Sequence, residues 1–118
     1  MRSDADRLRD ILEAIEKIKA RIPDSAAAFR QDELVQVWVI HYLQVIGEAA
    51  RGMSQGLKQR HPDVPWAEII ALRNILVHEY FGLNMEQVWT LTQRDLPKLE
   101  EQIRRMRAQL GGDAAAQA

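Results

Sequence analysis

Apolar residues recur every three or four positions along most of the chain, a spacing that predicts helices. The first such stretch covers residues 4–22, with Asp4 as the expected N-cap and Pro23 followed by Asp24 as the stop signal. Its apolar positions share one face of a helix: Leu8, Ile11, Leu12, Ile15, Ile18 and Ile22. Most of the other positions are charged, so the pattern predicts an amphipathic helix packed by one side.

A second and more apolar helix is predicted from residue 33 toward residue 60, with Asp32 as its N-cap. It follows a connector over residues 25–31, in which Phe29 is the expected core anchor. A strand over residues 35–40 is the alternative, because β-branched residues are dense there, but the length of the run favours a helix. A helix that is apolar around most of its circumference is either central or contacts both a core and a partner.

The chain turns at residues 61–65 and enters a third predicted helix from Trp66 to about Tyr80, with Pro65 suited to its first position and Gly82 to its stop. On a helix of 100° per residue, Arg73 lies within an otherwise apolar stripe. A neighbouring stripe of small and polar residues contains Ala67, Ala71, Asn74 and His78.

Three further signals divide the rest of the chain. Asn84 and Gln87 resemble a capping box and start a short helix. At residues 95–97, Asp-Leu-Pro, either another helix starts or a proline kinks one. A last amphipathic stripe is formed by Leu96, Leu99, Ile103, Met106 and Leu110. We expect the helix to end at Gly111 and Gly112, leaving residues 111–118 as a flexible tail.

Composition fits one soluble, all-α domain over residues 1–110, built as an antiparallel bundle of four to five helices. The 118 residues are 47% hydrophobic and 28% charged and include no cysteine, which indicates a reducing compartment. The N-terminus lacks an apolar signal core, and no stretch approaches the roughly 20 apolar residues of a membrane span, so we expect a cytoplasmic protein. A net charge of −1 argues against a broad basic surface that coats nucleic acid.

Three polar residues interrupt the third helix, in the stretch Leu-Arg-Asn-Ile-Leu-Val-His-Glu-Tyr at residues 72–80. Arg73, Asn74 and His78 can meet along one edge of the helix, on which Asn74 and His78 are four residues apart and can touch. An unpaired charge in an apolar stripe is costly, and Glu48 is the expected carboxylate partner of Arg73. These groups either satisfy each other in a core or line a site.

The stretch Arg-Asn-Ile-Leu-Val-His-Glu-Tyr resembles the R-x-x-x-x-H-x-Y motif of the HEPN superfamily, in its HepT-like ribonuclease toxin branch. Four other segments are similar in the same order: Gly-Glu-Ala at residues 47–49, Pro-Trp at 65–66, Val-Trp at 88–89 and Asp-Leu-Pro at 95–97. The resemblance extends from about Leu8 to Leu110.

The resemblance implies a HEPN-type homodimer that brings two motifs to one cleft and cleaves RNA without a metal or other cofactor. Arg73 would stabilise the scissile phosphate, His78 would be the general acid/base, and Asn74 would position the phosphate or His78. It also implies a toxin–antitoxin system, in which a nucleotidyltransferase antitoxin of the MNT type neutralises the toxin by adding AMP. Tyr80 would be the acceptor in this chain.

Two other hypotheses remain open. The chain is either a non-catalytic helical dimer that binds a nucleotide or a nucleotidyltransferase in the same cleft, or a structural dimer in which the pair of Arg73 and Glu48 only stabilises the core. His41 is expected in the core or at the dimer interface. The three histidines have no metal-ligand spacing, so no metal site is predicted.

Overall fold

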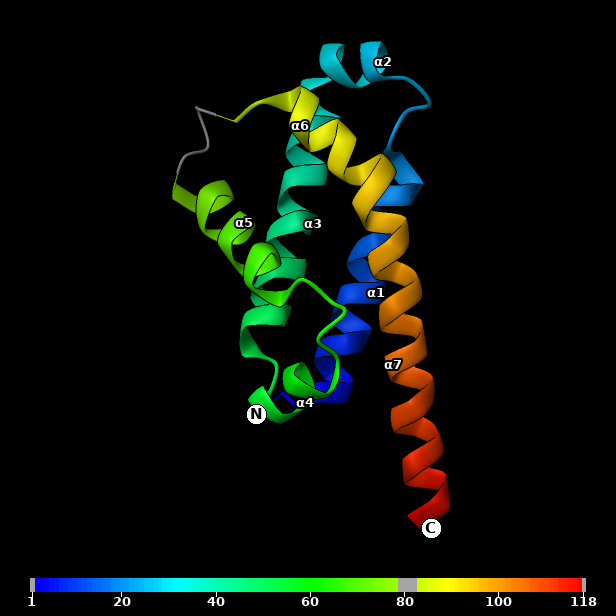
Figure 1. Ribbon diagram of the computed structural model, residues 1–118. Coiled ribbons are helices and arrows are strands. Elements are labelled where there is room, and N and C mark those ends of the chain that lie inside the picture. Colours follow the sequence, from blue (N-terminus) through cyan, green and yellow to red (C-terminus); the bar gives the residue numbers. More distant parts are fainter. Residues whose placement is uncertain (1, 79–82, 118) are drawn as a thin grey trace.

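The computed structural model describes residues 2–78 and 83–117, and every regular element in these residues is helical (Figure 1). The elements in chain order are α1 (Asp4–Arg21), α2 (Ala26–Gln31), α3 (Glu33–Gly52), α4 (Gln55–Arg60), α5 (Trp66–His78), α6 (Met85–Thr90), the π-helix η2 (Leu91–Asp95) and α7 (Leu96–Gln117). The all-α prediction is therefore confirmed for the described residues, and residues 35–40 are helical and not a strand.

The central helix is α3, which packs against α1 on one side and α5 on the other. The last helix, α7, lies along α1, and consecutive long helices run in opposite directions (Figure 1). The short helices α2 and α6 pack against each other at one end of the bundle, where Phe29 is buried as the sequence predicted. The other predicted anchors form one core with it, including Leu8, Ile18, Ile40, Leu43, Leu96 and Ile103.

The N-cap of α1 lies one residue earlier than predicted. Ser3 is the N-cap, and it forms a reciprocal capping box with Asp6, so the prediction of Asp4 as the N-cap was wrong. The Asp4 carboxylate instead accepts hydrogen bonds from the backbone N–H and the hydroxyl of Ser54, at 2.9 and 2.6 Å. Asp4 thus ties the start of α1 to the junction between α3 and α4.

The predicted long helix over residues 33–60 is two helices. Asp32 caps α3 as expected, but α3 ends at Gly52, and Met53 is extended with φ −63° and ψ 146°. Ser54 then accepts a hydrogen bond from the N–H of Leu57 and caps α4. Gly52 weakens the end of α3, and Ser54, a good N-cap residue, starts α4. The buried side chain of Met53 holds the break between the two helices against the core.

In the C-terminal part of the chain, the predicted helix start at Asn84 is confirmed, but the predicted end of the last helix is not. Asn84 caps α6 by accepting from the N–H groups of Glu86 and Gln87. The π-helix η2 connects α6 to α7. Helix α7 starts at Leu96, so Pro97 lies in its first turn, where a backbone N–H is not needed for an intrahelical hydrogen bond. The prediction that α7 ends at Gly111 was wrong, because the helix continues to Gln117. Glycine inside a helix costs only about 1 kcal/mol relative to alanine.

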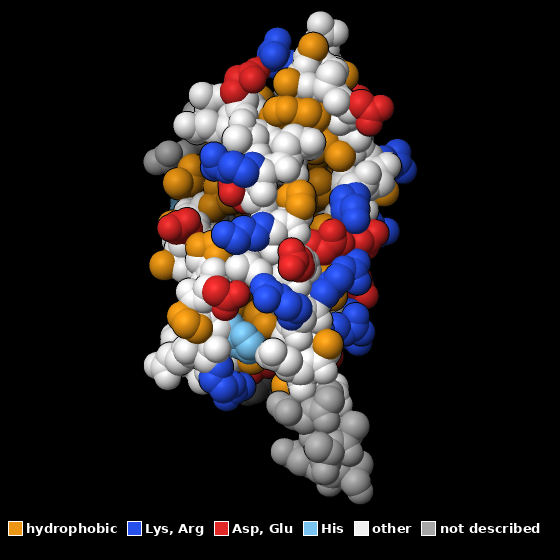
Figure 2. Space-filling model, turned by 45° about the vertical axis from the view of Figure 1, so that its right-hand side comes forward, with side chains coloured by type: hydrophobic (Ala, Val, Ile, Leu, Met, Phe, Trp, Pro, Cys, Tyr) orange, Lys and Arg blue, Asp and Glu red, His pale blue; other side chains and the backbone are white. Residues whose placement is uncertain are grey.

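Charged side chains of both signs are interspersed over the face that Figure 2 shows. Four charged residues join α1 to α7: Lys19 pairs with Glu100, and Arg104 pairs with Glu16 and, within α7, with Glu100. No helix in the described part of the chain is long and apolar enough to cross a membrane.

Candidate functional site

The polar stretch of the third predicted helix lies at the C-terminal end of α5, which crosses the middle of α3. The closest approach is at Gly47, where a Cβ atom would lie only 2.3 Å from the Cβ of Arg73. The absence of a side chain at Gly47 therefore lets α5 come close enough for Arg73 to reach the polar edge of α3.

The guanidinium of Arg73 is held by two neighbours. Its Nε lies 3.0 Å from Oε2 of Glu48, and its Nη1 donates a hydrogen bond of 3.0 Å to Oδ1 of Asn74. The predicted partnership of Arg73 with Glu48 is confirmed. The Arg73 side chain is 21% exposed and that of Glu48 is 57% exposed, so the pair stands at the surface and is not a sealed core pair.

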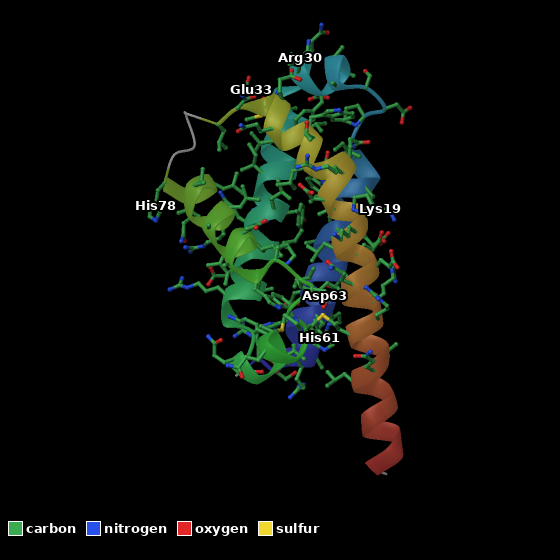
Figure 3. All side chains as sticks on the ribbon, viewed as in Figure 1. Lys19, Arg30, Glu33, His61, Asp63 and His78 are labelled. Atoms are coloured by element: carbon green, nitrogen blue, oxygen red, sulfur yellow. The ribbon has the colours of Figure 1, made fainter. Side chains whose placement is uncertain are left out.

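His78 lies five residues beyond Arg73, which corresponds to a rise of about 7.5 Å along the helix. It is exposed at the outer end of α5 and points away from the other helices (Figure 3). The structure thus brings together Arg73, Asn74 and Glu48, and it leaves the exposed His78 four residues, about one turn, beyond Asn74. Within residues 2–78 and 83–117, the side chain of His78 has no hydrogen bond or ion pair. Tyr80 lies outside the described residues.

One contact to this stretch was missed by the sequence analysis. The side-chain amide of Gln44, on α3, donates a hydrogen bond of 3.2 Å to the carbonyl oxygen of Leu76, in the last turn of α5. A signal was present, because Gln44 is a polar residue in an apolar run and lies one turn before Glu48. Of the two places expected for His41, the core is excluded because His41 is exposed, with its ring 4.8 Å from that of Tyr42, and a place at a dimer interface stays a prediction.

Exposed apolar side chains flank the polar set on both helices. Leu34 is 83% exposed at the start of α3, and Val37 follows it one turn later. On α5, Ile75 and Val77 are also exposed, next to His78. Soluble proteins bury most large aliphatic residues, and a group of exposed ones beside a polar site is typical of an interaction surface.

A cavity of about 430 Å³ lies elsewhere, between α3, α5, η2 and α7. Its lining includes Leu43, Ile69 and Leu72 but not Arg73, Asn74 or His78. The polar set therefore belongs to an open surface. An open surface with a fixed guanidinium suits an extended anionic ligand better than a small molecule that needs enclosure.

The comparisons with known proteins agree with the motif and the fold. The chain matches the family described as "Ribonuclease HepT-like" over residues 11–106. It is 36% identical over 107 residues to "Probable ribonuclease HepT" of Thermococcus cleftensis, covering 90% of this chain and 97% of that protein. It is 34% identical over 97 residues to "Putative RNase MJ1380" of Methanocaldococcus jannaschii, covering 81% of this chain and 89% of that protein. No solved structure matches at a comparable level of significance.

All-helical architecture, the motif on α5 and these matches define the class of protein. The chain belongs to the HepT-like ribonuclease family.

Proposed function

We propose that the protein is a metal-independent endoribonuclease and the toxin of a HEPN/MNT toxin–antitoxin system. The observation that carries the proposal is the surface position of Arg73, held by Glu48 and Asn74, with His78 exposed on the same helix. Guanidinium groups bind phosphate through paired N–H donors, and imidazole titrates near neutral pH. The relatives that match over most of their length carry ribonuclease names.

The reaction assigned to this site is attack of a ribose 2′-oxygen on the adjacent phosphorus. The imidazole of His78 takes the 2′-hydroxyl proton as the new P–O bond forms. The P–O5′ bond breaks as the protonated motif histidine of the second protomer gives its proton to O5′, which leaves a 2′,3′-cyclic phosphate and a 5′-hydroxyl end. Arg73 stabilises the negative charge that develops on the phosphorane oxygens. Each of these contributions is worth on the order of 10²-fold or more in rate.

A homodimer completes the proposed site, because one protomer offers one motif histidine while the reaction needs both a base and an acid. The exposed apolar residues on α3 and α5 support this arrangement: Leu34, Val37, Ile75 and Val77. Burying them between two copies would bring the two α5 helices together. One of the two alternatives predicted from sequence, that α3 contacts both a core and a partner, has the same basis, since α3 buries one side and exposes apolar residues on the other.

Regulation by AMP transfer to Tyr80 is part of the proposal and rests on the motif. Tyr80 follows the exposed His78 by two residues, so a bulky nucleotide there would obstruct the RNA-binding surface. Intact-mass measurement after incubation with an MNT-type nucleotidyltransferase and ATP tests it. We expect a gain of one AMP that Tyr80→Phe abolishes, and a gain retained by Tyr80→Phe would contradict the assignment.

The central experiment is RNA cleavage by the purified protein in the presence of a chelator. Arg73→Ala and His78→Ala should each abolish cleavage while circular dichroism and dimer mass stay unchanged, because both side chains lie at the surface. Retention of cleavage in both variants would overturn the catalytic assignment.

A second candidate function is a non-catalytic dimer that binds a nucleotide or a nucleotidyltransferase. The existing pairing of Arg73 with Glu48 favours it, because a paired guanidinium has fewer donors left for a reacting phosphate. A pure preparation that binds AMP or the transferase, but never cuts RNA, would support this alternative.

A further inference from the structure

Three consecutive contacts from α3 hold the motif stretch of α5. They come from Gln44, Gly47 and Glu48, which share one edge of α3 because residues three and four apart align on a helix. Gly47 touches Arg73, Glu48 pairs with it at 3.0 Å, and Gln44 donates to the carbonyl of Leu76 at 3.2 Å. The first two contacts act on Arg73, and the third acts nearer to His78.

The carbonyl that accepts from Gln44 belongs to the last turn of α5 that the structure describes, which ends at His78. Leu76 lies two residues before His78, and its side chain is fully buried. The backbone of this turn is therefore held by the hydrogen bond from Gln44, and its Leu76 side chain is held by packing in the core.

We propose that Gln44 is a positioning residue that fixes the last turn of α5, and through it the place of His78 relative to Arg73. The proposal rests on the proposed function, in which these two groups act on one phosphate. Gln44 does not itself touch the reacting atoms. The place of His78 depends on its backbone, since its imidazole makes no hydrogen bond or ion pair with the described part of the chain.

The same helix supplies a matched control. Gln36 also lies on α3, and its amide donates to the carbonyls of Phe29 and Arg30 at the end of α2, at 2.9 and 3.0 Å. Replacing either glutamine by methionine keeps the length of the side chain and removes the N–H donors. Gln36→Met therefore carries a comparable structural loss at a site remote from α5.

The experiment compares Gln44→Met and Gln36→Met by steady-state RNA cleavage and by hydrogen exchange of the amides of residues 74–78. We expect Gln44→Met to lower kcat on the order of tenfold with KM within twofold, because a displacement of even 1 Å slows chemistry strongly. Exchange at residues 74–78 should become faster in this variant. Gln36→Met should change neither quantity beyond twofold.

A third variant, Gln44→Lys, again offers an N–H donor at that position and should restore the slow exchange. Equal effects of the two methionine variants, or a Gln44→Met variant with unchanged kcat and exchange, would overturn the proposal. The two readouts also separate it from the proposed function. A wild-type protein that cuts no RNA, yet shows the exchange contrast, would support the positioning of this turn and contradict the nuclease assignment.

Discussion

Gly47 and Arg73 lie so close that a methyl group on the glycine would overlap the Cβ of the arginine, at 2.3 Å. Both the backbone of α3 and the base of the Arg73 side chain are fixed by packing, so neither moves away without displacing its helix. The contact sets how near α5 comes to α3. It therefore also sets whether Arg73 can reach Glu48 on α3.

Gly47→Ala should destabilise the protein despite the better helix propensity of alanine. Overpacking typically costs about 1–3 kcal/mol, whereas replacing glycine inside a helix gains about 0.5–1 kcal/mol. Urea unfolding measures the difference. Gly56→Ala is the control, because a Cβ there would have only the Nη1 of Arg60 nearby, at 3.8 Å, and we expect a small gain in stability. A stabilised Gly47→Ala protein would show that the contact is not tight.

Glu48→Gln tests whether the ion pair of Glu48 with Arg73 mainly stabilises the folded state. Because the Glu48 side chain is 57% exposed, we expect the free energy of unfolding to change by less than about 1 kcal/mol. RNA cleavage should fall several-fold, since the guanidinium loses one of its two anchors. A loss of stability well above 2 kcal/mol, with cleavage unaffected, would favour the purely structural hypothesis.

Arg73→Lys should retain the positive charge and lose most of the activity. A lysine ammonium is a point charge and lacks the planar fork that can face a carboxylate, an amide and a phosphate together. We expect kcat for RNA cleavage to fall on the order of 10²-fold with thermal stability nearly unchanged. A lysine variant with wild-type kcat would mean that charge alone, without the fork, accounts for the role of Arg73.

If the exposed apolar residues form the dimer interface, a substitution there should prevent dimerisation without unfolding the protomer. Leu34→Glu should yield a folded monomer, because Leu34 is almost fully exposed and the new carboxylate would be buried against the partner. A glutamate in the first turn of α3 is also compatible with the helix dipole. Light scattering after size exclusion measures the mass, with Gln59→Glu on α4 as an exposed control that should stay dimeric. A Leu34→Glu protein that remains a dimer would place the interface elsewhere.

Glu100 predicts a pH dependence of stability. Burial raises the pKa of its carboxyl group, but hydrogen bonds from Arg104 and Lys19 outweigh burial and hold the pKa below its ordinary value of 4.5. A lowered pKa in the folded state stabilises the protein above the pKa of the unfolded chain, and this stabilisation is lost as the pH falls through the folded value. Glu100→Gln should therefore cost about 1 kcal/mol at pH 7, after screening of its half-exposed partners.

The difference between wild type and Glu100→Gln should shrink when unfolding is measured in urea below pH 4. The neighbouring Glu101 is exposed and has no ion pair within the described residues, so Glu101→Gln should show little effect at either pH. A difference that stays constant from pH 7 to pH 3 would indicate that the carboxylate charge is not the cause.

The sequence by itself determined the helical class, the core positions and the members of the polar set. The spacing of apolar residues fixes which face of each helix is buried, and capping residues such as Asp32 and Asn84 act on their immediate neighbours. The partnership of Arg73 with Glu48 was also predictable, because an arginine in an apolar stripe needs a carboxylate and α3 offers one.

Only the tertiary structure decided where the long helix breaks, how α7 begins and which groups meet. The break after Gly52 depends on burial of Met53 and on the contact of Asp4 with Ser54, two residues fifty positions apart. The bond from Gln44 to Leu76 likewise joins different helices. Contacts of this kind depend on the crossing of α3 and α5, and local periodicity carries no information about that crossing.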